Sequence, residues 1–153
     1  MPPLSSFLFF FGITYDENTP YITMKNLDVL TKYIKSHYGS SVRIILSEQG
    51  YSSVPWGEAN QAAALAYSYY IAACNPMIDG FMIRSYMDHP IESAQGLYMG
   101  IAGKEAFEVF KYMDTSKTYQ YTNRYLGIIG AKSWGKAVPR FKKSKLLKLY
   151  RRL

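Results

Sequence analysis

Short apolar runs alternate along this chain with longer stretches of helical pattern, and this alternation constrains the fold more than any other feature. The run 42–46 (VRIIL) is bounded by glycine and serine and predicts a strand buried on both faces. The run Gly80–Tyr86 predicts a second strand, and Leu8–Phe11 a third or the damaged remnant of one. Strands that alternate with helices imply a parallel α/β architecture, either a doubly wound sheet or a (β/α) barrel.

Three helices are expected between and after these strands. Thr23 can cap a helix that ends near His37, and the Ala-rich stretch Glu58–Ala73 has no Pro or Gly to interrupt it. A third helix is predicted over Lys104–Met113, where apolar residues recur at helical spacing. The connection Met87–Gly103 is long for a compact domain, and loops of this length at strand ends are usually functional or disordered.

The basic charge of the chain is concentrated at its end. Residues 1–100 hold 5 Lys/Arg against 8 Asp/Glu, whereas residues 101–153 hold 13 against 3. We therefore predict one α/β domain over residues 1–131 and a basic tail over residues 132–153, and no nucleic acid partner for the main body. The tail is interpreted as solvated or as altered by truncation or a frameshift, and the alternative is contact with an anionic surface or RNA.

Several functional classes are excluded or disfavoured by composition. The single cysteine, Cys74, allows no internal disulfide and no cysteine-based metal site, and it leaves the compartment open. The apolar run Leu4–Phe11 lacks the flanks of a signal peptide and is too short to span a bilayer. We expect a soluble chain with no membrane span, no metal and no cofactor.

Polar residues follow both predicted strands at the edge where parallel α/β proteins place their sites. Glu48 comes directly after VRIIL, and Gly50 beside it allows a sharp turn. A carboxylate at that point must be exposed in a cleft, paired or hydrogen-bonded. Arg84, Asp88 and His89 follow the second strand and are candidates for binding a polar substrate or for setting the charge of Glu48. The competing interpretation is that Glu48 pairs with an arginine and only fixes a loop.

Aromatic residues near the same edge suit a sugar, because rings stack on the apolar face of a pyranose. Trp56 and Tyr51 are the candidates for substrate binding, and Tyr86 is a weaker one. Packing of the loops is the alternative explanation for each of these side chains.

Five segments of the chain carry a resemblance to a known family. They are PYITMKNLDVLTKYI (20–34), ILSEQGYSS (45–53), QAAALAYSYYIAA (61–73), IDGFMIRSYMDHPIE (78–92) and FEVFKYMDT (107–115). In this order the segments resemble the C-terminal region of domain-of-unknown-function family 5722. The resemblance implies a bacterial glycosidase similar to the clan A glycoside hydrolases, built as a (β/α)8 TIM-type barrel.

The resemblance also implies roles for particular residues. The chain would cover about strands 6–8 of the barrel with their helices, and would be incomplete as given. VRIIL would be the seventh strand, at whose end clan A enzymes place the nucleophilic glutamate, and Glu48 occupies that place. The acid/base glutamate of clan A follows the fourth strand, so no residue here takes that role by resemblance.

These observations lead to three hypotheses. The first is a fragment of a retaining glycoside hydrolase acting on a β-linked glycan, with Glu48 as the nucleophile. The second is a carbohydrate-binding or structural module without catalysis, or an inactive truncated gene product. The third is contact with nucleic acid through residues 132–153, which would weaken steeply with salt.

Overall fold

The computed structural model describes residues 12–141 of the chain as a mixed α/β fold, which confirms the coarse fold class expected from the sequence. Helices follow each of the two strands and make up most of the regular structure. In chain order the elements are α2 (Leu27–Tyr38), β1 (Ile44–Gln49), α3 (Glu58–Cys74), β2 (Ile78–Ile83), α4 (Pro90–Ala94), α5 (Glu105–Tyr112), α6 (Thr118–Thr122), the 3-10 helix η1 (Asn123–Tyr125), α7 (Leu126–Ile129) and α8 (Trp134–Ala137).

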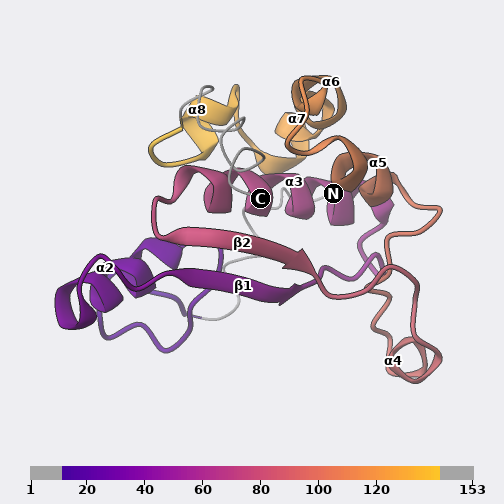
Figure 1. Cartoon of the computed structure of the whole chain (residues 1–153). Helices are drawn as coiled ribbons and strands as arrows, with labels where there is room; N and C mark the ends of the chain where they lie inside the picture. The colour runs from indigo at the N-terminus through magenta and orange to yellow at the C-terminus, as the bar shows by residue number, and fades with distance from the viewer. Residues whose placement is uncertain (1–11, 142–153) are drawn as a thin grey trace.

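The two strands β1 and β2 form a parallel pair, with Leu46 opposite Phe81. Parallel neighbours need a long crossover, and α3 supplies it (Figure 1). Because both strands run in the same direction, their carboxyl ends lie at one edge of the sheet. The loops that follow β1 and β2 therefore emerge side by side, as the sequence predicted for the site.

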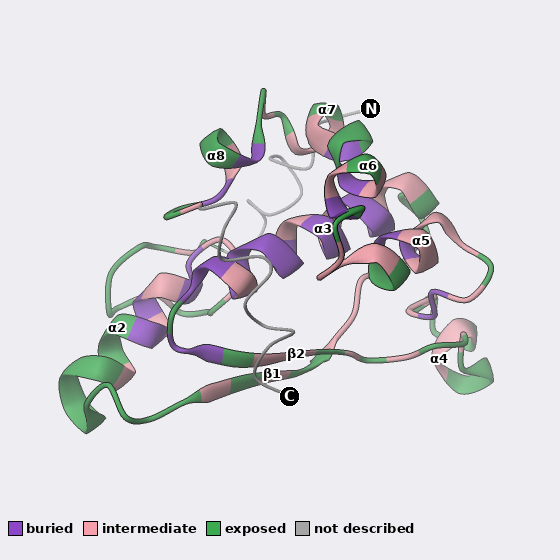
Figure 2. Ribbon diagram, turned by 45° about the horizontal axis from the view of Figure 1, so that its top comes forward, coloured by how far each residue is buried: buried purple, intermediate pink, exposed green. Residues whose placement is uncertain are grey.

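Helix α3 is the centre of the core. It lies between the sheet and a second helical layer formed by α5, α6, α7 and α8 (Figure 1), and it is mostly buried (Figure 2). Ala62, Ala63 and Ala66 are fully buried, because small side chains let the neighbouring elements approach closely. The Tyr70 ring lies 4.2 Å from the ring of Trp134 and fills the space between the two helical layers.

Within residues 12–141, other elements cover only one of the two faces of the sheet. The predicted burial of the first strand on both faces is therefore wrong for this part of the chain. Leu46 and Phe81 face α3 and are half-buried. On the opposite face, Ile45 is 59% exposed and Met82 is 53% exposed. No element within residues 12–141 packs over these two side chains, and a hydrophobic pattern alone does not reveal whether a second layer exists.

Element boundaries differ from the expectations by a few residues. Helix α2 begins after Asn26 rather than after Thr23, because the Asn26 side chain accepts the Thr23 N–H at 2.7 Å and so closes the turn before the helix. Strand β1 extends to Gln49, beyond the predicted end at Leu46. This extension places Glu48 within the strand's irregular final residues.

The first residues of the predicted basic tail pack against the domain. Trp134 and Val138 belong to the core, and the Arg140 guanidinium forms an ion pair with Asp28 of α2 at 2.5 Å. The described core thus continues past residue 131, and the domain boundary placed there stays a prediction. The strand expected at Leu8–Phe11 and the end of the tail, 142–153, lie outside the described residues.

Candidate active site

Glu48 lies in an irregularity at the carboxyl end of β1. The pairing of β1 with β2 shifts between Leu46 and Gln49, so that Glu48 falls outside the regular ladder. Its φ angle is 57°, in the left-handed region that residues other than glycine rarely adopt because Cβ crowds the carbonyl oxygen. Its side chain is 75% exposed. This backbone presents the Glu48 carboxylate to solvent. Bulges are frequent beside active sites, and strained backbone conformations are frequent at functional positions.

Arg84 approaches Glu48 from the end of the neighbouring strand. Its backbone N–H donates to the Gln49 carbonyl oxygen at 2.9 Å, directly after β2 ends. A Cβ at Gly50 would lie 3.1 Å from Cβ of Arg84, so the absence of a side chain there makes room for the arginine stem. One guanidinium nitrogen lies 3.6 Å from a Glu48 carboxylate oxygen, and the other terminal nitrogen pairs with Glu92. The hydrogen bond from Arg84 to Glu92 is the main cause of the raised pKa of Arg84, and Glu48 contributes less.

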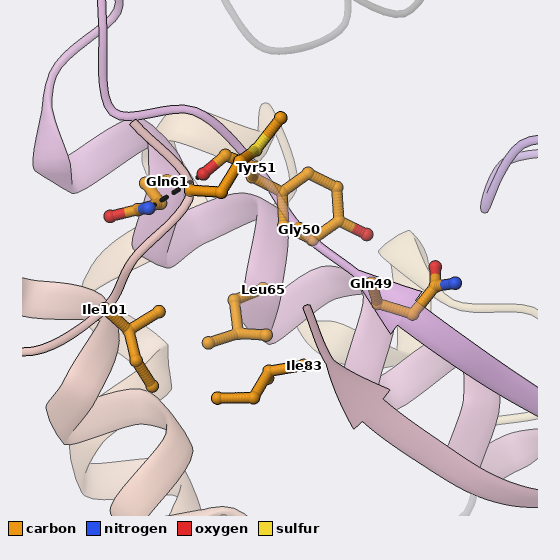
Figure 3. A pocket seen from close by; sticks show the side chains of 8 residues that line it. Gln49, Gly50, Tyr51, Gln61, Leu65, Ile83 and Ile101 are labelled. Atoms are coloured by element: carbon orange, nitrogen blue, oxygen red, sulfur yellow. Dashed lines mark hydrogen bonds between the residues drawn. The ribbon is translucent and has the colours of Figure 1, made fainter. Parts of the chain in front are cut away.

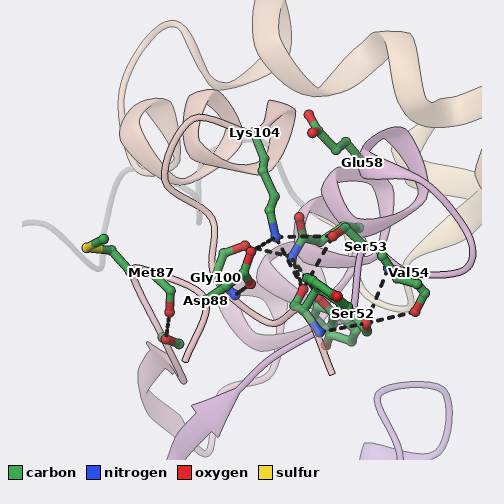
Figure 4. A network of polar contacts seen from close by, with 12 residues as sticks. Ser52, Ser53, Val54, Glu58, Met87, Asp88, Gly100 and Lys104 are labelled. Carbon is green, nitrogen blue, oxygen red and sulfur yellow. Dashed lines mark hydrogen bonds and ion pairs between the residues drawn. The ribbon is translucent and has the colours of Figure 1, made fainter. Parts of the chain in front are cut away.

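Asp88 is directed toward the base of its own loop. Its carboxylate accepts the Gly100 N–H at 2.7 Å and lies 2.7 Å from the Lys104 ammonium (Figure 4). A Cβ at Gly100 would lie 2.3 Å from the Asp88 backbone nitrogen, so only glycine fits this close approach. His89 is exposed and immediately precedes α4, without a side-chain capping bond. The substrate-binding roles of Asp88 and His89 stay predictions.

Two side chains tie the loops after β1 and β2 together behind Glu48. The Lys104 ammonium lies 3.1 Å from the hydroxyl of buried Ser53, in the loop after β1 (Figure 4). The Gln61 side-chain amide donates to the carbonyl oxygens of Tyr51 at 2.7 Å and Gly100 at 3.0 Å. The Gln61 bonds satisfy loop carbonyl oxygens that would otherwise need a hydrogen bond from water. Together with the Lys104 bond, they hold the loops after β1 and β2 against each other.

Sequence reasoning missed most of this supporting group. Gln61 is a polar residue directly before the apolar stretch 62–67 of an Ala-rich run, and that contrast was a local signal of a buried hydrogen-bonding role. Glu92 lies in the long connection after the second strand, and nothing in the sequence links it to Arg84. Lys104 and Ser53 are 51 residues apart, and no spacing in the sequence joins them.

The three aromatic candidates differ in exposure and contacts. Trp56 is 42% exposed, in the loop that follows Glu48. Tyr51 points inward, where its hydroxyl bonds to the Ser68 hydroxyl of α3, and burial raises the pKa of Tyr51 to about 12. Tyr86 is 56% exposed and meets Phe107 edge to face. Trp56 and Tyr86 thus present surface to a ligand, whereas the Tyr51 hydroxyl is already occupied.

A small cavity lies behind the strand ends (Figure 3). It has about 10 Å³ of free volume, and the buried Gln61 Oε1 beside it has no partner among the described residues. Its lining residues are Gln49, Gly50, Tyr51, Gln61, Leu65, Ile83, Met99 and Ile101. This volume suits roughly one water molecule.

Residues 12–141 hold no cluster of three or more His, Cys, Asp or Glu side chains arranged to bind a metal ion. Within the same residues, every helix is too short or too polar to cross a bilayer.

Comparison with known proteins gives one match. A family model described as "Family of unknown function (DUF5722)" matches residues 6–137. No curated protein and no solved structure matches the chain. The match covers most of the sequence, including both strands, α3 and Glu48, and the chain therefore belongs to the DUF5722 family.

Proposed function

We propose that this chain carries the nucleophile of a retaining glycoside hydrolase that acts on a β-linked glycan, and that Glu48 is that nucleophile. The observation that carries the proposal is the backbone of Glu48, which holds an exposed carboxylate in a left-handed bulge at the carboxyl end of a parallel strand. A structural ion pair does not require such a conformation, since long side chains reach their partners from ordinary strand backbone.

The surroundings of Glu48 support this assignment. Arg84 keeps a positive charge 3.6 Å from the carboxylate without a close hydrogen bond, which leaves the carboxylate oxygens accessible. The exposed ring of Trp56, in the loop after Glu48, offers a stacking surface of the kind that sugars use.

In the proposed reaction, a Glu48 oxygen attacks the anomeric carbon as the bond to the leaving oxygen breaks, which gives a covalent glycosyl ester. A second carboxyl group, about 5–5.5 Å away in retaining enzymes, protonates the leaving oxygen and later deprotonates the water that hydrolyses the ester. In the clan A enzymes that the sequence resembles, this second group follows an earlier strand. We therefore assign the acid/base role to no residue of this chain.

The same proposal includes the finer fold assignment, in which β1 and β2 are strands 7 and 8 of a (β/α)8 barrel. The parallel pairing of the strands and the α3 crossover are compatible with it. The exposed apolar face that carries Ile45 and Met82 would then point into the barrel, where bulky apolar side chains pack in layers.

Substrates with a good leaving group test whether Glu48 acts as a nucleophile, because they do not need the acid/base residue to protonate the leaving oxygen. Dinitrophenolate leaves without protonation, so the first step on a dinitrophenyl β-glycoside, in which the glycosyl ester forms and dinitrophenolate is released, needs only a nucleophile. With a panel of glucoside, galactoside, mannoside and xyloside, we expect the chain to release dinitrophenolate from at least one. Glu48→Gln should reduce this rate by several orders of magnitude.

Glu58→Gln is the matched control, because Glu58 is an exposed glutamate at the start of α3, after the same loop. It should keep the wild-type rate. Equal release by the wild-type and Glu48→Gln chains, or no release above the uncatalysed rate from any member of the panel, would contradict the proposed hydrolase.

Exposed Trp56 also favours a second candidate, a carbohydrate-binding module without catalysis. This alternative predicts glycan binding that is retained in Glu48→Gln and lost in Trp56→Ala, with no release of dinitrophenolate.

A further inference from the structure

Arg84 lies between two carboxylates that hold it unequally. Glu92 forms a direct hydrogen-bonded ion pair with one terminal nitrogen, and Glu48 lies 3.6 Å from the other. The Glu92 side chain is only 22% exposed, against 75% for Glu48. A less exposed pair with direct hydrogen bonding is the stronger one, so Glu92 determines where the guanidinium lies.

The position of Glu92 is itself fixed by the fold of its loop. The Glu92 carbonyl oxygen accepts the backbone N–H groups of Gln95 and Leu97, both at 2.9 Å, which closes the turn after α4. At the base of the loop, the Tyr86 carbonyl oxygen accepts N–H groups from Ile101 at 3.0 Å and Ala102 at 2.8 Å. These bonds close the loop that contains α4, and they fix the position of Glu92 within it.

The 3.6 Å separation between the Arg84 guanidinium and the Glu48 carboxylate affects how reactive the carboxylate is. A guanidinium in bidentate contact with a carboxylate occupies the lone pairs that a nucleophile needs, whereas a cation 3.6 Å away leaves those lone pairs accessible. Within residues 12–141, Glu48 is the other carboxylate in ion-pair contact with Arg84. If the pair with Glu92 were lost, Arg84 would be drawn onto Glu48.

We propose that Glu92 is a positioning residue of the site, which holds Arg84 beside Glu48 and prevents the guanidinium from closing onto the Glu48 oxygens. The location of Arg84 follows from the contacts alone, and the consequence for reactivity rests on the proposed hydrolase function.

The structural part is tested first, in Glu92→Gln and Glu92→Asp chains, by crystallography and by the NMR signal of the Arg84 Nε–H group. In Glu92→Gln the Arg84 guanidinium should move into direct contact with Glu48, and the NMR signal should shift. Glu92→Asp keeps the charge and should retain a wild-type-like signal. An unmoved Arg84 in Glu92→Gln would overturn the proposal, whatever the enzyme activity.

The kinetic part uses release of dinitrophenolate. Glu92→Gln should lower the rate constant for the first release of dinitrophenolate roughly tenfold, with little change in the substrate concentration that gives half of the maximal rate constant. Glu92→Asp should restore most of this rate constant. Adding Arg84→Met to Glu92→Gln should recover part of the loss, because the cation that blocks Glu48 is then absent.

Glu108→Gln removes a negative charge from α5 and serves as the control, with an unchanged rate. A double variant slower than Glu92→Gln alone would overturn the blocking role. Absence of turnover in the wild-type chain would count against the hydrolase function only, since the position of Arg84 is measured independently.

Discussion

Glu48 and Asp114 are acidic residues with the same unusual backbone, and they differ in what their side chains contact. Their φ angles are 57° and 63°. Asp114 is half-buried after α5, where its carboxylate accepts the Tyr69 hydroxyl and its N–H donates back to that hydroxyl at 3.0 Å. Glu48 is exposed, and within residues 12–141 its carboxylate has only the 3.6 Å approach of Arg84.

The difference shows how each conformation is retained. At Asp114 the surrounding structure explains the left-handed turn, because two hydrogen bonds to Tyr69 hold it and aspartate tolerates this region of backbone space. At Glu48 the direct contacts of the side chain do not explain it. Strain without compensation from its own contacts is the pattern expected of a residue kept for function.

Tyr69→Phe should give the largest effect of three substitutions that probe this comparison. It removes the hydroxyl that serves both the carboxylate and the N–H of Asp114, and half-buried polar groups without partners are costly. We expect the free energy of unfolding to fall by about 2 kcal/mol, measured by urea denaturation.

The matched control is Tyr86→Phe, at a tyrosine that is 56% exposed near the proposed site. It should change stability by less than about 0.5 kcal/mol. Equal effects of the two substitutions would show that the Asp114 turn is not held by Tyr69.

Asp114→Asn should have a smaller effect that depends on pH. Burial is the larger influence on the Asp114 carboxyl and raises its pKa above the ordinary value of 3.8, while the Tyr69 hydroxyl acts in the opposite direction. Because the folded state then binds the proton more tightly than the unfolded state, stability decreases as pH rises from 3.8 through the folded-state pKa.

Asparagine tolerates the left-handed backbone, can still accept the Tyr69 hydroxyl and carries no charge to bury. The variant should therefore lack this pH dependence and be more stable than wild type at pH 7, with the advantage shrinking in acid. Unfolding curves at pH 3 and pH 7 measure the difference. If Asp114→Asn lost more stability at pH 7 than at pH 3, the raised pKa assigned to Asp114 would be contradicted.

Glu48→Asn should give the smallest change in the free energy of unfolding. The change should be an increase, whereas Tyr69→Phe should give a decrease. Asparagine relieves part of the backbone strain, and the exposed ion pair with Arg84 contributes little. We expect stability to rise by about 0.5 kcal/mol. A clear loss of stability would mean that Glu48 fixes a loop, as the competing interpretation of the sequence holds.

Local patterns predicted β1, β2, α2, α3 and α5, but they predicted neither the short helices α4, α6, η1, α7 and α8 nor the environment of the strands. The β-branched run before Glu48 and the Ala-rich stretch of α3 specify a strand and a helix by their own residues. The helix was predicted within one residue of its observed bounds, and the strand within two residues at its start and three at its end. The exposure of Ile45 was not predictable, because an apolar strand has the same sequence whether one layer or two layers cover it.

The candidate site was predictable only in part, for a related physical reason. The position of Glu48 follows from the rule that parallel strands place polar loops at one edge, and that rule needs only the order of elements. The pairing of Arg84 with Glu92 and of Lys104 with Asp88 depends on how a long loop folds back. The left-handed backbone of Glu48 depends on the register of two strands about 30 residues apart.

Covalent trapping tests the central claim most directly. A deoxyfluoro dinitrophenyl β-glycoside forms a glycosyl ester with a nucleophilic carboxylate and breaks down slowly, so the labelled peptide can be sequenced by mass spectrometry. The account predicts one label, on the peptide that contains Glu48, and none in Glu48→Gln. A label on another carboxylate, or no label with any sugar that the chain binds, would contradict it.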